Sequence, residues 1–199
     1  GEMSGLYATI DDYDLVGFII GVVEKKKIIN GNTITAGDVI IGLPSSGLHT
    51  NGYSLVRKIF GETRSELEKY YPELDRTLGE ELLEPHRCYY NQLRPLLPHI
   101  KGMAHITGGG LIDNIPRTLP DGLTAQLEAS AWTVPPIFRL IQEQGNVDPD
   151  EMYRVFNMGI GMVVICSPQD ADKLRGELAD STVIGQVVKQ EGESRVIIE

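Results

Sequence analysis

HITGGGLIDNIPR, residues 105–117, places three consecutive glycines between a short apolar run and an apolar-periodic segment. Glycine loses more backbone freedom on folding than any other residue, so a glycine triplet indicates a backbone that turns sharply, takes a positive φ or approaches a ligand closely. A strand, glycines and a helix start in succession would direct several N–H groups at one point, which suits a phosphate. A tight strand-to-helix turn without a ligand explains the segment equally well, so this segment alone leaves both interpretations open.

A second loop has the same design. The apolar run 38–43 predicts a strand, the sequence SSGLHTNG follows at residues 45–52, and apolar residues at helical spacing come next, with Thr50 or Asn51 as candidate N-cap. Ligand-binding loops concentrate at the ends of strands. If both loops face one crevice, they would hold an anionic substrate between two helix N-termini. The alternative is two capped helix starts without a ligand.

Two of the four histidines are candidates for chemistry. His49 and His105 lie in or beside these loops, and an imidazole can exchange protons near neutral pH or donate to an oxyanion. The alternative for each is a structural histidine satisfied by the backbone. His86, beside Arg87, and His99 fit structural positions better.

The run FNMGIGM at residues 156–162 carries glycines at alternate strand positions. Such spacing clears one face of a strand, so that a ligand or another backbone can approach it. Close sheet packing or a bulge is the alternative explanation.

Metal-binding patterns are weak in this sequence. Asp11, Asp12 and Asp14 form an acidic cluster suited to Mg²⁺, although an exposed acidic loop is the commoner reason for such a run. Cys88 and Cys166 lack Cys-x-x-Cys pairing, so no zinc or redox motif is predicted and no metal ligand is assigned. Walker, dinucleotide-binding, nucleophile-elbow and zinc-protease motifs are also missing from the sequence.

Composition and charge restrict the function classes. The 199 residues are 41% apolar and 23% charged, which is enough for a hydrophobic core and suits one large domain, or one with a partial second. A net charge of −10 argues against broad nucleic-acid binding, which needs a basic face. Since no apolar run approaches membrane-spanning length and no signal pattern is present, we expect a cytoplasmic protein that binds neither nucleic acid nor membrane.

Strand and helix patterns alternate irregularly along the chain. This indicates an α+β fold, a mixed β-sheet with helices packed on its faces, rather than a doubly wound sheet. Strands are predicted at residues 16–23, 38–43, 103–106, 123–127, 156–165, 183–188 and 195–199, a hairpin at 25–34, and helices after 52, within 78–97, at 136–145, from 149 and at 168–179.

Four runs together carry a family resemblance: residues 12–14 with 17–18, 45–57, 105–110 with 114–117, and 151–154 with 156–162. In this order they resemble the phosphoribosylformylglycinamidine cyclo-ligases, also called aminoimidazole ribonucleotide synthetases. Thr50 stands where many relatives have serine, and Ser4 where the family motif has proline. The resemblance implies a C-terminal α+β domain with αβα layers over residues 24–199, and residues 1–23 as a remnant, loop and last strand, of the preceding ATP-binding domain.

For that family, the resemblance implies an ATP-dependent carbon–nitrogen ligase of de novo purine biosynthesis. ATP activates the formyl amide oxygen of formylglycinamidine ribonucleotide as an iminophosphate, and the amidine nitrogen then closes the imidazole ring of aminoimidazole ribonucleotide. ATP and Mg²⁺ would be held mainly by the preceding domain, which also largely forms the dimer interface. We therefore expect a homodimer for the full-length protein and no turnover by this fragment.

The site residues expected in this half come from the loops. The loops suit either the ribose 5-phosphate or the phosphate that develops during the reaction. His49 is the candidate catalytic residue, and its role as a base is left open. Substrate- or phosphate-binding residues are expected to be Ser45, Ser46, Gly47, Asn51, Thr107, Gly108, Gly109, Gly110 and Asn157.

Two alternatives remain. The first is a relative within the same superfamily, of the formylglycinamidine ribonucleotide synthetase, selenophosphate synthetase, thiamine monophosphate kinase or hydrogenase-maturation type. The uninterrupted run from Thr107 to Arg117 favours the cyclo-ligase over these. The second is a non-catalytic binding or assembly module that uses the same fold.

Overall fold

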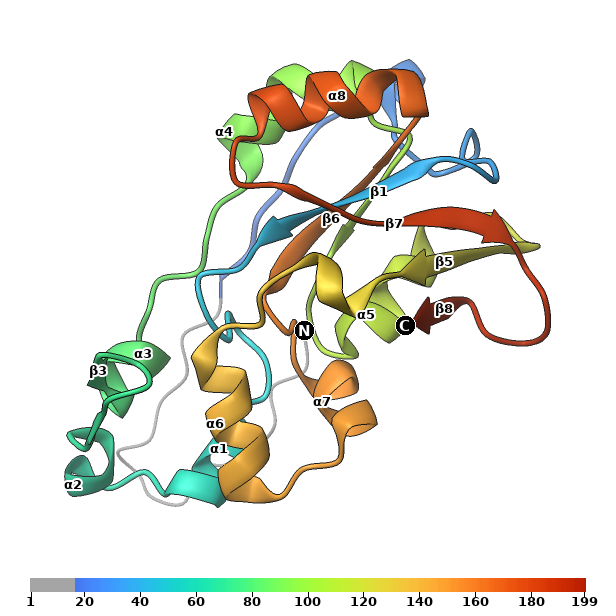
Figure 1. Cartoon of the computed structure of the whole chain (residues 1–199). Coiled ribbons are helices and arrows are strands. Elements are labelled where there is room, and N and C mark those ends of the chain that lie inside the picture. Colours follow the sequence, from blue (N-terminus) through green and yellow to red (C-terminus); the bar gives the residue numbers. More distant parts are fainter. Residues whose placement is uncertain (1–16) are drawn as a thin grey trace.

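The computed structural model describes residues 17–199, and its centre is a six-stranded mixed sheet (Figure 1). The strand order is β4-β6-β1-β7-β5-β8. All neighbours are antiparallel except β5 and β8, which run parallel. The strands are β1 (Val39–Pro44), β4 (Gly102–His105), β5 (Leu123–Leu127), β6 (Ile160–Cys166), β7 (Thr182–Lys189) and β8 (Val196–Ile198). The α+β class predicted from the sequence is confirmed.

Apolar side chains cover both faces of the central strands, and the alternation along each strand divides them between two cores. In β1, Ile40 belongs to one core and Ile41 to the other. In β6, Val163 and Val164 divide in the same way. Successive side chains of a strand point to opposite faces, so a strand buried on both sides has a continuous apolar sequence.

Helices cover the two faces. On one face lie α4 (Tyr90–Leu93), the 3₁₀ segment η2 (Arg94–His99) and α8 (Pro168–Glu177). On the other lie α5 (Gly110–Asn114) and η3 (Ile115–Arg117). The sequence correctly predicts the start of α8, where the Ser167 side chain accepts a hydrogen bond from the Asp170 N–H.

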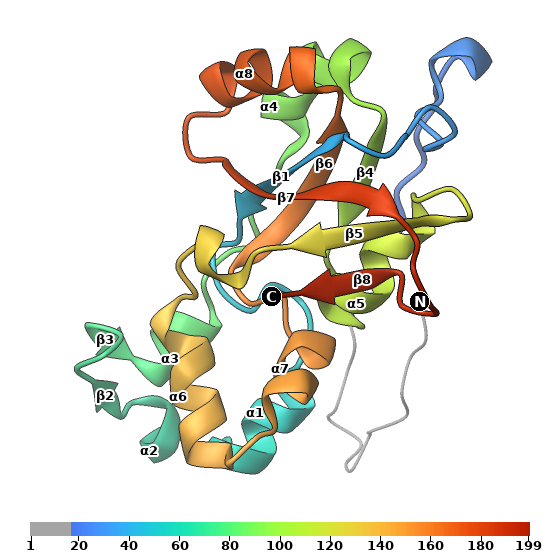
Figure 2. The same cartoon turned by 45° about the vertical axis from the view of Figure 1, so that its right-hand side comes forward.

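A third core lies in a helical lobe beyond one end of the sheet (Figure 2). It includes Val56, Leu78, Phe138 and Met152, each from a different helix, and Phe156. The elements of the lobe are α1 (Tyr53–Phe60), α2 (Arg64–Leu67), α3 (Leu78–Leu82), α6 (Pro136–Gly145), α7 (Pro149–Val155) and the small ribbon of β2 (Tyr70–Tyr71) and β3 (Arg76–Thr77); η4 (Ala129–Ala131) connects β5 towards this lobe.

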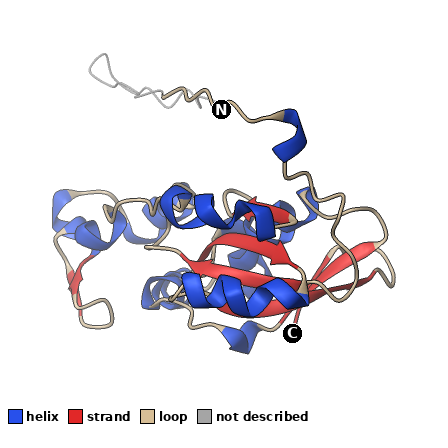
Figure 3. Ribbon diagram, turned by 90° about the horizontal axis from the view of Figure 1, so that it is seen from above, coloured by secondary structure: helices blue, strands red, loops and turns tan. Residues whose placement is uncertain are grey.

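The predictions for the N-terminal segment are wrong within the described residues. Residues 17–24 form no strand, and the predicted hairpin at 25–34 is a 3₁₀ turn, η1 (Lys25–Lys27), followed by loop. Phe18, Ile19 and Val22 are more than nine-tenths exposed, and the segment leads away from the sheet (Figure 3). A strand needs a neighbour for its backbone groups, and none of residues 17–199 pairs with this segment.

The acidic cluster at Asp11, Asp12 and Asp14, and the first of the four matching runs up to residue 14, lie outside the described residues. Among the residues that are described, no helix is long and apolar enough to cross a bilayer.

Candidate functional site

The two glycine-containing loops meet at one edge of the sheet. Strands β1 and β4 are both antiparallel to β6, so they run in the same direction and their carboxyl ends lie at the same edge. The loop after β1 therefore lies beside the loop after β4. A Cβ placed on Gly108 would lie 3.2 Å from Oδ1 of Asn51, which puts the two loops in contact.

Asn157 joins the first loop to the segment before β6. Its side chain is buried and uses both ends of the amide. Nδ2 donates to the carbonyl oxygens of Gly47 at 2.9 Å and Leu48 at 3.2 Å. Oδ1 accepts from Oγ of Ser45 at 2.9 Å and from the Gly159 N–H at 2.8 Å. In this arrangement Asn157 holds the loop, and its amide is fully used by protein groups.

The glycine triplet is a turn that requires glycine. Gly109 and Gly110 have φ of +93° and +57°, and a Cβ on Gly110 would lie 1.9 Å from the carbonyl oxygen of Tyr153. The sharp turn and the positive φ expected from the sequence are present here. The close approach is to the backbone that ends α7.

Asn114, which the sequence does not single out, holds this turn from inside. Its buried Nδ2 donates to the carbonyl oxygens of Thr107, Gly108 and Gly110 at 3.3, 3.2 and 2.8 Å. With these carbonyls turned inward, the N–H groups of residues 107–109 have no hydrogen-bond partner among residues 17–199. The turn therefore has three amides that no described residue pairs, a set suited to an anion.

The N-termini of the two helices that follow the loops are less suited to binding an anion than predicted. Helix α5 has only five residues, so its dipole is small. The N-cap of α1 is Gly52 in a left-handed conformation with no side-chain cap, rather than Thr50 or Asn51. A Cβ on Gly52 would lie 2.1 Å from the ring of Phe156, which explains why a capping side chain is excluded there.

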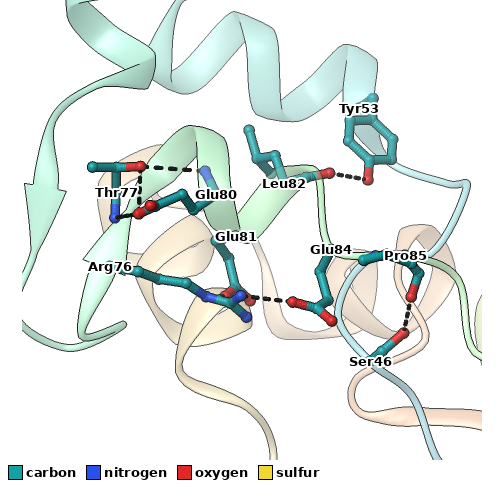
Figure 4. Close-up of polar contacts among 9 residues, drawn as sticks. All are labelled: Ser46, Tyr53, Arg76, Thr77, Glu80, Glu81, Leu82, Glu84 and Pro85. Carbon is teal, nitrogen blue, oxygen red and sulfur yellow. Dashed lines mark hydrogen bonds and ion pairs between the residues drawn. The ribbon is translucent and has the colours of Figure 1, made fainter.

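The helical lobe and the segment after α3 contact the first loop (Figure 4). Oγ of Ser46 donates to the Pro85 carbonyl at 2.7 Å, and the Tyr53 hydroxyl donates to the Leu82 carbonyl at 2.8 Å. Arg76 holds this segment through ion pairs to Glu81 and Glu84. Ser46 is thus engaged with the protein in this structure, while the Asn51 side chain has no hydrogen bond within the described part of the chain.

His49 belongs to the first loop, and its side chain is buried beneath that loop. It has a positive φ of 61° and is only 6% exposed. Nε2 accepts from the Ser46 N–H at 3.0 Å, so the ring proton of the neutral imidazole is on Nδ1. That Nδ1 is buried with no hydrogen-bond partner among the described residues. Burial, and then the neighbouring His86, His105 and Arg87, lower the pKa of His49 to about 4.

His86 packs against His49. The sequence did not indicate His86 as a member of the site. The two rings stack with centroids 3.9 Å apart, and Nε2 of His86 lies 3.1 Å from Nε2 of His105. Burial lowers the pKa of both His86 and His105. No local signal marks His86, because its position depends on residues 61–88 folding back onto the sheet edge.

The alternate glycines of the run 156–162 serve packing. A Cβ on Gly161 would lie 2.1 Å from the Tyr89 hydroxyl and 2.5 Å from Cε1 of His49. Gly159 has a φ of +97° and lies against Pro135. Gly161 therefore makes the space in which His49 sits.

The depressed pKa of His49 gives a pH dependence of stability. Its folded pKa of about 4 lies below the unfolded value of 6.5, so its contribution is fully present above pH 6.5 and is lost as the pH falls towards 4. We expect the free energy of unfolding of the chain to decrease over this range, and the decrease to be shallower in His49→Gln. Urea unfolding at half-unit pH intervals measures both slopes; identical slopes would contradict the assignment.

The family follows from comparison with known proteins. The chain belongs to the AIR synthase related proteins, as their C-terminal domain, whose family model matches residues 35–198. It is 52% identical over 200 residues to the phosphoribosylformylglycinamidine cyclo-ligase of Geobacillus thermodenitrificans, covering 97% of this chain and 58% of that protein. It is 50% identical over 205 residues to the cyclo-ligase of Caldicellulosiruptor bescii, covering 99% and 59%. The chain thus spans less than two thirds of these relatives, and the predicted resemblance is confirmed.

Solved structures agree on the fold. Thiamine-monophosphate kinase from Stenotrophomonas maltophilia superposes with a TM-score of 0.59 at 16% identity, covering 89% of this chain and 54% of that one. HypE of E. coli gives 0.53 at 20% identity, covering 84% and 48%. At these identities the likeness concerns the fold alone.

Proposed function

We propose that this chain is the C-terminal part of an ATP-dependent cyclo-ligase that converts formylglycinamidine ribonucleotide to aminoimidazole ribonucleotide in de novo purine biosynthesis. The observation that carries the proposal is the 52% identity to a protein of that name over 97% of the chain. The meeting of the two predicted loops supports it, because their contact forms one anion-capable surface. The full-length protein would act in the cytoplasm as a homodimer.

The loops would hold the anionic part of the substrate. The amides of Thr107, Gly108 and Gly109 have no partner among residues 17–199 and suit phosphate oxygens, as N–H groups do in other phosphate sites. Asn51 would add a side-chain contact from the facing loop. Ser45, Ser46, Gly47, Gly110 and Asn157 would act by fixing the geometry of these groups, since the structure engages them with the protein or buries them.

His49 is proposed as the residue next to the reacting atoms. Its low pKa keeps the ring neutral at pH 7, and its Nδ1–H, which no described residue pairs, is a donor suited to an oxyanion. Donation from Nδ1 fits this geometry better than a role as general base, because Nε2 already accepts from the Ser46 amide.

ATP and Mg²⁺ would be held mainly by a domain that precedes residue 24. The chain covers 58% of the Geobacillus relative, and the remainder of such a protein would supply that domain. Residues 1–23 would belong with it. The exposed Phe18, Ile19 and Val22 support this placement, because an apolar run without a partner is suited to pairing with another unit.

Calorimetric titration of the chain with formylglycinamidine ribonucleotide tests the proposal. We expect measurable binding, and binding weaker by about ten- to 150-fold in Asn51→Ala, because a hydrogen bond to a charged group contributes about 1.5–3 kcal/mol. Asn91→Ala is the matched control, since Asn91 is exposed and lies in α4, outside both loops. Absence of binding by the unmodified chain would favour a non-catalytic assembly module. Turnover by the chain alone would refute the placement of ATP in a preceding domain.

A further inference from the structure

Three imidazoles converge beside the first loop from distant parts of the chain. His49 follows β1, His86 precedes α4, and His105 ends β4. One ring nitrogen from each lies within 4.8 Å of the others. Among residues 17–199 this is the one group of three or more histidine, cysteine or acidic side chains with such spacing.

The two exposed members of this histidine cluster face each other through Nε2. The 3.1 Å between Nε2 of His86 and Nε2 of His105 is close to the separation of two nitrogens on one tetrahedral ion, about 3.3 Å for metal–nitrogen bonds of about 2.0 Å. Both rings also line a cavity of about 580 Å³, so an ion between them would have room for further ligands.

His49 supplies an independent observation. It is more than nine-tenths buried, and its Nδ1–H has no acceptor among the described residues. A buried donor without a partner destabilises the fold. Because Nε2 accepts from the Ser46 amide, Nδ1 carries the proton and cannot itself be a metal ligand in this geometry. It can donate to a water or anionic oxygen bound to an ion.

We propose that His86 and His105 bind one transition-metal ion of the Zn²⁺ class through Nε2, and that the Nδ1–H of His49 donates to an oxygen ligand of that ion. Neutral imidazoles suit Zn²⁺, Co²⁺ and Ni²⁺ in preference to Mg²⁺, which takes oxygen ligands. The ion is distinct from the Mg²⁺ that would accompany ATP, and its binding does not depend on the proposed function, although both use His49.

The test is titration of the tag-free chain with Co²⁺ and Zn²⁺ at pH 7. We expect one ion per chain by calorimetry, and visible Co²⁺ absorption typical of a four- or five-coordinate site. His86→Ala and His105→Ala should each weaken binding at least tenfold, while His49→Gln weakens it only a few-fold.

Two control variants separate this site from other metal-binding groups. His99→Gln should bind as the unmodified chain does, because His99 lies at Asp170 and Lys173 instead of in the cluster. Cys88→Ser should also bind normally, although Cys88 is exposed and lines the same cavity. His86 is exposed, so its alanine variant is expected to fold, and circular dichroism checks this. Absence of binding, or binding unchanged in both His86→Ala and His105→Ala, would refute the proposal.

Discussion

Gly110→Ala is expected to lower the free energy of unfolding by about 2–6 kcal/mol, the sum of about 1–3 kcal/mol for a left-handed residue other than glycine and about 1–3 kcal/mol for overpacking. The added Cβ would lie 1.9 Å from the carbonyl oxygen of Tyr153 and 2.9 Å from that of Phe156. Both are backbone atoms, so relief requires the glycine turn to move away from the end of α7. Urea unfolding followed by circular dichroism measures the loss.

Gly176→Ala is the matched control. Gly176 lies in α8, has no atom within 4 Å of an added Cβ, and does not have a positive φ. Alanine there should stabilise the chain by about 0.5–1 kcal/mol, as in other helix interiors. If the two variants were equally stable, the turn at Gly110 would not have the close approach described above.

Asn114→Asp should cost about 3 kcal/mol or more, because it replaces a buried donor to three carbonyls by a buried carboxylate that repels them. The substitution preserves shape almost completely, so packing is not the cause of the loss. The carbonyl oxygens of Thr107, Gly108 and Gly110 would lose their partner together. The melting temperature and urea midpoint at pH 7 are the measurements.

Asn91→Asp provides the comparison for this second variant. Asn91 is exposed in α4, and surface substitutions of this kind change stability by about 0.5 kcal/mol or less. Equal midpoints for the Asn114 and Asn91 variants would show that the amide of Asn114 does not hold the turn.

The strands of the sheet could be predicted because their signals are local. The run from Val39 to Leu43 is apolar at every position except Gly42, and Leu123 to Leu127 follows the turn residues Asp121 and Gly122, so the predicted bounds of both strands lie within one or two residues of the observed ones. The segment from residue 17 to 23 carries an equally strong local signal and forms no strand. Whether a segment forms a strand depends on a neighbouring strand with which it can pair. The sequence of this segment does not contain that information.

The site was predictable only in part. Glycines and hydroxyls mark the loops at Ser45 and Thr107 because the backbone itself needs those residue types. Asn114 has no such mark, since its role depends on three carbonyls that turn towards it only in the folded loop. His86 likewise contacts His49 and His105 only after the lobe has folded. The periodicity of the sequence predicts helices and strands, but not contacts between residues so far apart in the chain.

The hydrogen bond from Ser45 to Asn157 spans 112 positions of the chain. Closing a loop of that length costs entropy before any contact offsets it, and such distant pairings slow folding. The bond can form only once β1 and β6 lie side by side, because these strands bring its two ends together. The rate at which the proposed substrate binding returns during refolding would therefore report the pairing of the two central strands.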